Sequence, residues 1–389
     1  MIADFHLHYP MHVVPEQSGP SRELFRSASA RAGLLDRVRA VAIHLFGRLA
    51  NYGSFESGPR VTIPRMRAGG VRVGFSVLYS FWDEMDWPRG ANSPPDPRYF
   101  SRLIRQLEAV ERETRERFPE EALLARTPAE LDAGIDAGKS VLVHCVEGAF
   151  HLGPDPDGIA RKVAELAERG VAYITVGHLF NRGVAEVANA IPFLPDALWR
   201  VMFSQPTEPL LGPGRATIRA AADQRVLIDL SHMTEHAIDA TLSLLDGVDP
   251  KRRVPVVATH AGYRFGDQQY MLCARHVEAI ARRGGVIGLI LAEHQTSDGI
   301  RSDRTHSLEE SVDVLSRHVD RIRELTGNHD HVAIGSDFDG FIKPTLAGLD
   351  STTDMAQLER ALVERYGAED GGKITSGNLL RLLREHWRS

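Results

Sequence analysis

Short, continuous apolar runs recur along the chain, and amphipathic stretches separate them. Apolar runs of this kind are typical of strands in a parallel sheet that is buried on both faces. Eight strands are therefore predicted, at residues 2–5, 71–78, 140–145, 172–176, 226–230, 254–258, 286–290 and 331–335.

Helical periodicity fills most of the gaps between these runs. Apolar residues at helical spacing predict an amphipathic helix over 99–117, and the apolar set is Leu103, Ile104, Leu107 and Val110. Further helices are predicted at 22–50, 158–169, 234–246, 274–283 and 308–326. Residues 54–59 are predicted to be a loop, as is the Trp- and Pro-rich stretch 81–97, which is long enough to form the wall of a site.

Alternation of eight strands with helices indicates the fold class. It predicts an α/β protein, a (β/α)8 TIM barrel with inserted loops and C-terminal helices, in a single domain covering residues 1–389. A doubly wound open sheet is the structural alternative.

Polar residues with metal-binding side chains stand at the carboxyl ends of the predicted strands. His6 and His8 leave the first strand on one face, because alternate residues of a strand share a face. The other strand ends supply Glu147, His178, His232, His260 and Asp337. In a TIM barrel the active site lies at this end, so the cluster predicts a metal site, whereas a single strand-end histidine would indicate a structural role.

Imidazole and carboxylate groups in this number suit two zinc ions per chain. The expected ligands are His6, His8, Glu147, His232 and His260, with Glu147 as the natural bridge. Two adjacent metals would share a bridging hydroxide whose pKa falls towards neutrality, which gives a nucleophile at pH 7.

Other polar residues are predicted to have ordinary roles. His144 is expected in the core, Asp229 behind a metal ligand, and Asp339 in support of its loop. Cys145 is expected to be a small apolar filler. The remaining histidines are predicted to lie mostly at the solvated surface, and they include His12, His151, His276, His294 and His318.

Composition narrows the function classes. A hydrophobic fraction of 43% and a charged fraction of 25% are ordinary for a soluble globular protein. A net charge of −6 argues against a nucleic-acid partner, and no apolar run is long enough to cross a membrane. The two cysteines, Cys145 and Cys273, and the lack of a signal peptide lead us to expect a cytoplasmic location. A small-molecule substrate is expected, and a homodimer is the assembly to test.

Several motifs resemble the membrane (renal) dipeptidase family of zinc hydrolases. They are Val146-Glu147-Gly148, Asp229-Leu230-Ser231-His232, Thr259-His260-Ala261, Arg283-Gly284-Gly285-Val286, Gly335-Ser336-Asp337-Phe338-Asp339-Gly340 and Ser376-Gly377-Asn378-Leu379-Leu380-Arg381. The resemblance implies that Glu147 bridges two zincs. It places His6 and His8 on one zinc and His232 and His260 on the other. It also implies that Asp337 handles the proton and that His178 binds the substrate carbonyl or oxyanion.

Two positions depart from the family pattern. His8 stands where the family has an aspartate, and Tyr270 stands where it has an arginine for the terminal carboxylate of the substrate. Arg264 lies near enough in sequence to be considered as a substitute. A tyrosine hydroxyl cannot offer the charged, bidentate fork of a guanidinium. Simple dipeptides are therefore expected to be poor substrates.

These observations favour a binuclear zinc hydrolase that cleaves a peptide or amide bond, in a dipeptide, an N-acyl amino acid or a lactam-like compound. One alternative is a TatD-like phosphoester hydrolase, which the acidic net charge disfavours for nucleic acids. The other is a non-catalytic metal-binding barrel, which would not need Asp337 and His178.

Overall fold

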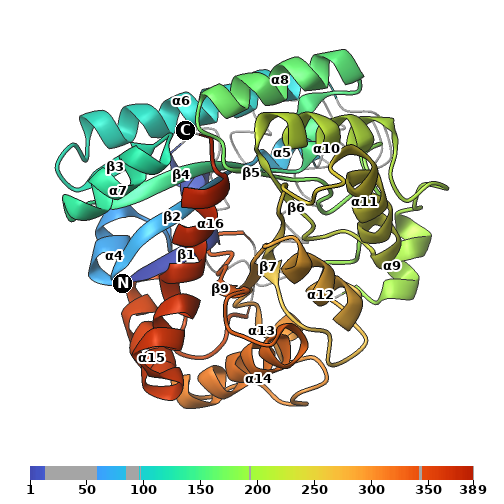
Figure 1. Cartoon of the computed structure of the whole chain (residues 1–389). Helices are drawn as coiled ribbons and strands as arrows, with labels where there is room; N and C mark the ends of the chain where they lie inside the picture. The colour runs from blue at the N-terminus through green and yellow to red at the C-terminus, as the bar shows by residue number, and fades with distance from the viewer. Residues whose placement is uncertain (14–58, 85–95, 97, 192–193, 341–343, 389) are drawn as a thin grey trace, which may run out of the picture.

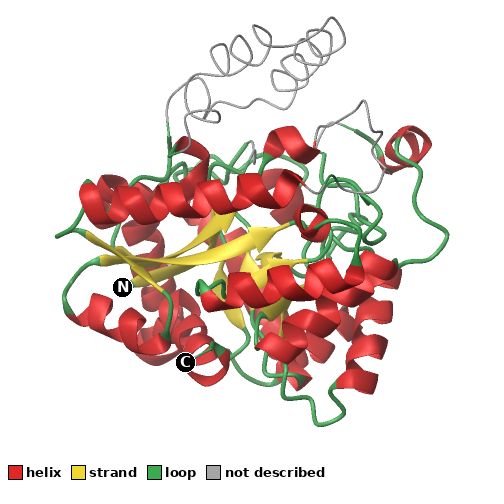
Figure 2. Cartoon of the chain, turned by 90° about the horizontal axis from the view of Figure 1, so that it is seen from above, coloured by secondary structure: helices red, strands yellow, loops and turns green. Residues whose placement is uncertain are grey.

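The computed structural model describes residues 1–13, 59–84, 96, 98–191, 194–340 and 344–388. Across these residues nine parallel strands form one sheet that closes on itself. They are β1 (Ile2–Leu7), β2 (Val71–Leu78), β3 (Ala122–Ala125), β4 (Ser140–Glu147), β5 (Tyr173–Thr175), β6 (Leu227–Asp229), β7 (Val256–Ala261), β8 (Ile287–Leu289) and β9 (Val332–Ile334). Figures 1 and 2 show the strands at the centre with helices packed around them. The predicted (β/α)8 barrel is confirmed.

Strand β3 is the one that the apolar pattern did not predict. Strand β2 occupies one edge of β4 along its length, from Val141 to Val146. On the other edge, β3 pairs with residues 140–143 of β4, and β5 pairs with Val146 and Glu147. Because β3 and β5 share that edge, the ring itself has the eight predicted strands and β3 is an addition beside it.

The helices between the strands begin and end close to the predicted positions. They are α6 (Arg98–Glu116), α8 (Pro156–Glu168), α11 (Glu235–Val248), α12 (Ala274–Arg282) and α14 (Leu308–Thr326). Helix α14 illustrates why: the Ser307 side chain accepts a hydrogen bond from the Glu310 amide at its start. It ends at Gly327, whose φ of 87° suits glycine.

Other helical segments lacked a clear sequence signal. They are α4 (Ile63–Ala68), α5 (Phe81–Glu84), α7 (Pro128–Asp136), α9 (Asp196–Met202), α10 (Gly212–Gln224) and α13 (Glu293–Thr296). Helices α15 (Met355–Gly372) and α16 (Asn378–His386) lie where C-terminal helices were predicted. Residues 81–97 were predicted to be a loop, but α5 shows that this stretch starts with a helical turn. The rest of the stretch, 85–95 and 97, lies outside the described residues. The predicted helix at 22–50 and residues 54–58 of the predicted loop also lie outside them. None of the described helices is both long and apolar enough to span a bilayer.

The barrel interior is a separate apolar core. Nearly every strand contributes to it, and Phe5, Phe75 and Tyr173 pack edge to face or stacked with ring centroids 4.8–6.0 Å apart. Leu383 and Trp387, from α16 and the residue after it, belong to the same core. Helix α16 therefore covers the end of the barrel at which the strands begin, across β1 and β9 (Figure 1). The opposite end is left for the polar cluster.

Candidate metal centre

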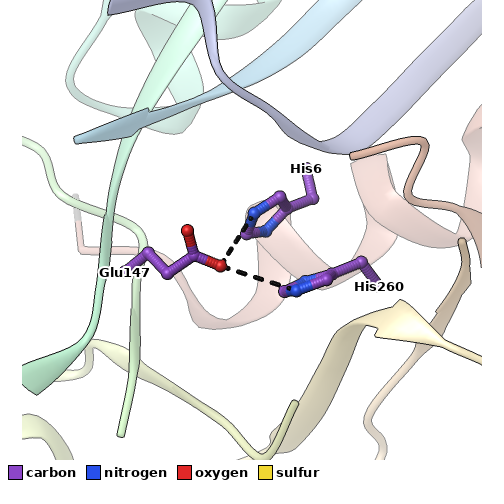
Figure 3. A group of neighbouring side chains, drawn as sticks. All are labelled: His6, Glu147 and His260. Atoms are coloured by element: carbon purple, nitrogen blue, oxygen red, sulfur yellow. Dashed lines mark ion pairs between the residues drawn. The ribbon is translucent and has the colours of Figure 1, made fainter. Parts of the chain in front are cut away.

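Glu147 lies at the centre of the cluster, at the carboxyl end of β4. Val143 and Cys145 point into the barrel core, so Glu147, two residues further on, continues the inward-facing column. Five imidazole Nε2 atoms surround its carboxylate: His6 at 3.2 Å, His178 at 3.3 Å, His8 at 3.4 Å, His260 at 3.5 Å and His232 at 3.6 Å. Figure 3 shows His6 and His260 turned towards the same oxygen of Glu147.

Several atoms of this cluster are buried without a hydrogen-bond partner. They include both carboxylate oxygens of Glu147 and Nε2 of His6. Leaving such groups unsatisfied costs free energy, and a cation would satisfy them. Three overlapping groups have ligand atoms within 4.8 Å of one another: His6, Glu147 and His260; His6, His8 and Asp337; and Glu147, His178 and His232. The donor set fits divalent zinc-like ions.

A local irregularity in β1 turns its histidines inward. Phe5 faces the barrel core, so strict alternation would turn His6 outward. The pairing of β1 with β2 shifts register between Asp4 and Leu7. This irregularity lets Phe5 and His6, although adjacent, both face the interior. His6 thereby reaches Glu147, and His8 comes within 3.2 Å of the carboxylate of Asp337.

The far side of the histidine rings is held by hydroxyl groups. The Thr259 hydroxyl donates to the Asp229 carboxylate at 2.8 Å, so its oxygen accepts from Nδ1 of His260 at 2.8 Å and of His6 at 3.0 Å. Tyr173 donates to the Phe5 carbonyl and lies 2.8 Å from the same His6 Nδ1. With a proton on Nδ1, each ring presents the lone pair of Nε2 to the centre. Asp229 thus lies behind the predicted ligands and contacts them through Thr259.

Two residues of the centre adopt left-handed backbone conformations. His232 has φ 67° and Asp337 has φ 59°, a region that residues other than glycine rarely occupy. Such strain persists where the surrounding structure enforces it, and it clusters at functional sites.

Glu84, which the sequence did not single out, contacts the centre through His178. Its carboxylate accepts a hydrogen bond from Nδ1 of His178, and the side chain is fully buried. Burial raises the pKa of Glu84, but His178 and Arg182 outweigh it and hold the pKa below its ordinary value. The only sequence signal was its position in the stretch 81–97, predicted as a site wall.

The charges of the centre divide the histidines into two kinds. Burial alone would lower the pKa of His178, but Glu147 and Glu84 raise it to about 9. Burial, with His6 and His232 beside it, holds the pKa of His260 well below its ordinary value. His260 is therefore neutral at pH 7, the form that binds metal.

Comparison with known proteins places this centre in a family. The model of the membrane dipeptidase family (peptidase family M19) matches residues 32–388. The chain belongs to this family of hydrolases. His6 and His8 precede the matched residues, so the family match covers every other member of the predicted site.

Individual proteins that resemble this chain are distant in sequence. An uncharacterized protein from the pqqA 5' region of Klebsiella pneumoniae is 29% identical over 195 residues, which span 48% of this chain and 66% of that protein. Dipeptidase ataJ of Aspergillus terreus is 24% identical over 83% of this chain and 76% of its own length. A Rhodobacter sphaeroides metallo peptidase, solved with a phosphinate mimic of the dipeptide L-Ala-D-Ala, has a TM-score of 0.70 at 20% identity and covers 99% of each chain.

Tyr270, predicted to stand in place of a carboxylate-binding arginine, lies beside the centre, but its hydroxyl group is already hydrogen-bonded. Its ring meets that of His232 edge to face at 5.0 Å, and its hydroxyl donates to the His260 carbonyl at 3.0 Å. Burial, with Asp337 and Glu147 adding to it, raises the pKa of Tyr270 well above its ordinary value. The side chain therefore remains a neutral phenol.

Arg264 is tied to its own surroundings. Its guanidinium pairs with Glu235 and donates to the Met271 carbonyl at 2.8 and 3.0 Å. Substrate contact by Arg264 would require these bonds to be exchanged, and its predicted role stays a prediction.

The remaining polar residues separate into correct and wrong predictions. Asp339 supports its loop as predicted, accepting from the Arg60 and Val61 amides at 2.9 Å each. The surface prediction was wrong for three histidines that are almost fully buried: His151, His276 and His318. Each is buried because a ring nitrogen has a polar partner, as with Nε2 of His318 and the Thr296 carbonyl at 2.9 Å.

Proposed function

We propose that this chain is a binuclear metal-dependent hydrolase that cleaves an amide or peptide bond in a small substrate. The supporting observation is the Glu147 carboxylate, buried without a hydrogen-bond partner among five imidazole Nε2 atoms. His6 and His8 would hold one zinc ion and His232 and His260 the other, with Glu147 between them. Bound zinc supplies Lewis acidity towards the carbonyl group and lowers the pKa of water.

The two residues proposed to meet the substrate are the more accessible members of the cluster. The side chains of Asp337 and His178 are 9% and 7% exposed, and that of His232 is 6% exposed, whereas those of His6 and Glu147 are 0% and 1%. Asp337 is proposed to pass the proton to the leaving amine, and His178 to bind the carbonyl oxygen as charge develops on it.

The metal proposal is tested by elemental analysis of purified protein. Wild type should carry close to two divalent ions per chain and lose them, with its activity, on dialysis against a chelator. Glu147→Gln should lower the metal content, because the bridging carboxylate is gone. Glu293→Gln is the matched control, since Glu293 is also buried but binds Thr305. Wild-type protein without metal, and indifferent to chelators, would contradict the proposal.

Substrate preference is proposed to follow from Tyr270. A substrate with a free C-terminal carboxylate lacks the charge-assisted hydrogen bond that an arginine would give, worth about 1.5–3 kcal/mol, or roughly ten- to 150-fold in kcat/KM. His8 in place of a carboxylate also leaves the centre one charge more positive. N-acyl, ester or lactam-like compounds without that carboxylate should therefore be better substrates than simple dipeptides.

A matched pair of substrates tests this preference: one dipeptide and its C-terminal amide, each assayed under saturating zinc. The amide should be cleaved at least as efficiently as the free acid. A strong preference for the free acid would show that Arg264 or another cation binds the carboxylate, and Arg264→Gln would then identify which.

A further inference from the structure

We propose that Glu84 is a positioning residue, which fixes the orientation of the His178 ring so that its Nε2 faces the metal centre. This inference rests on the proposed function, because His178 matters only if the centre binds a substrate. It assigns a role to α5, which comes from the stretch of chain between β2 and α6.

The carboxylate of Glu84 grips both the His178 ring and the backbone that follows it. One oxygen accepts from Nδ1 of His178, and the other accepts from the Phe180 amide at 3.1 Å. Because the two oxygens belong to one carboxylate, they fix the His178 ring relative to the Phe180 backbone in the same loop. A carboxylate provides both acceptors, whereas no single neutral side chain in this place could do so.

Arg182, on the loop that carries His178, binds the backbone of α5. Its guanidinium donates to the carbonyls of Asp83, at 3.0 Å, and Glu84. Arg182 is 1% exposed and has φ 45°. A left-handed backbone conformation and a buried charge both cost free energy of folding, and the structure keeps both at this residue. The loop that carries His178 and the helix that carries Glu84 therefore hold each other in both directions.

Packing of the neighbouring rings does not prevent a half-turn of the His178 ring, whereas the hydrogen bond to Glu84 does. The His178 ring is flanked by Tyr79, with centroids 4.7 Å apart, and by His232, with centroids 4.4 Å apart. Rotation by half a turn would keep its shape between these neighbours but exchange Nε2 for a carbon. The bond from Nδ1 to Glu84 distinguishes the two orientations, and it places Nε2 at 3.3 Å from Glu147.

Kinetics of Glu84→Ala provide the first test. Partners behind a functional histidine typically contribute about 10–100-fold, so kcat should fall by that factor while KM changes less than about threefold and metal content stays unchanged. Glu84→Gln should recover part of the loss, because its one amide oxygen can still accept from Nδ1. Glu293→Ala removes another buried carboxylate from a four-residue helix and should leave kcat near the wild-type value.

A double variant separates positioning from general loss of structure. If Glu84 acts through His178, adding Glu84→Ala to His178→Ala should lower kcat no further. A second, full loss in that background would overturn the proposal, as would normal kcat in Glu84→Ala. If Glu84→Ala does not fold, the same comparison is made with Glu84→Gln.

A readout independent of activity is the Nδ1 signal of His178 in ¹⁵N-histidine NMR, with the signal assigned by its loss in His178→Asn. Wild type should show a proton on Nδ1, and Glu84→Ala should show a mixture or a shift of the Nδ1 signal. An unchanged Nδ1 signal in the variant would contradict the role of Glu84. Wild type that cleaves no amide or peptide bond but gives the expected spectra would contradict the proposed function instead.

Discussion

Asp337 is held in a left-handed conformation by contacts on both sides. Its amide donates to the His6 carbonyl at 2.9 Å, which ties it to β1. Gly340 leaves room for it, since a Cβ there would lie 1.8 Å from an Asp337 carboxylate oxygen and 2.7 Å from the His8 ring. The last glycine of the Gly-Ser-Asp-Phe-Asp-Gly motif is therefore needed by the site itself.

Asp337→Asn should separate proton transfer from metal binding. Asparagine tolerates the left-handed conformation and keeps an oxygen that can approach a cation, but it cannot take up a proton. We expect unchanged metal content and a kcat lower by about 10²–10⁴-fold. Steady-state kinetics and elemental analysis measure the two quantities, and near-normal turnover would assign the proton to another group.

The sequence predicted the residues of the centre that stand at strand ends, and the structure brings them together. His6, Glu147 and His260 could be placed because a parallel barrel gathers the carboxyl ends of its strands. Glu84 could not, since it sits in a long connection, and the role of Thr259 beside His260 could not, since a strand-end hydroxyl group has no distinct sequence signal. Their roles depend on which neighbour the fold brings to them.

Strands β6 and β7 support two proposed metal ligands through one hydroxyl group. Asp229 ends β6 and accepts from Thr259 of β7, whose oxygen serves both His6 and His260. The pairing of these parallel strands thus fixes ring orientations on β1 and β7 together.

Thr259→Val should weaken metal binding while preserving the strand. Valine is close to threonine in size but neither accepts nor donates a hydrogen bond, so His260 loses its Nδ1 partner and His6 keeps only Tyr173. Metal affinity should fall by about 10–100-fold, measured by competition with a chelating dye. Thr241→Val, which removes a buried hydroxyl in α11, is the control and should leave affinity unchanged. Equal affinities in the two variants would contradict the role of Thr259.

Elements were predictable where burial on both faces leaves a continuous apolar run, as in β2 and β4. Strand β3 was missed because Ala122 to Ala125 is short and half-buried, and two of its four side chains are only partly covered. Helix α5 was missed because Phe81–Glu84 is a single turn, too short for helical periodicity to appear.

Buried neutral histidines make the stability of the whole molecule depend on pH. His318 on α14 accepts from the Tyr263 amide at 3.1 Å, and burial lowers its pKa to about 4. The unfolded chain, with an ordinary value of 6.5, binds more protons than the folded one between these pH values. Stability is therefore lost as pH falls from about 6.5 towards 4.

Urea unfolding at pH 7 and pH 5 tests this expectation. From the two pKa values, His318 should account for about 2 kcal/mol of the free energy of unfolding lost at pH 5. Between pH 7 and pH 5, the free energy of unfolding of His318→Asn should therefore fall less than that of the wild type, and the difference should equal this amount. The exposed His306→Asn is the control, and a His318 variant with the wild-type pH dependence would contradict the assignment.

The overall architecture followed from strand number and order, because eight buried strands alternating with helices have few arrangements. Which residues close the two ends of the barrel did not follow. Apolar residues of α16, such as Leu383, are at helical spacing and predict only a buried face, without saying that the face covers the barrel core.

Pairing of β1 with β9 joins the first strand of the chain to the last. During translation, His6 leaves the ribosome more than three hundred residues before Asp337. The pairing of Asp4 with Ile334 joins strands that are equally far apart in the sequence. The ring cannot close, and the proposed metal ligands cannot converge, until β9 has been synthesised. Helix α16 covers the core later still. Under the proposed function, metal uptake follows the synthesis of β9, and nascent chains arrested before β9 should retain no metal.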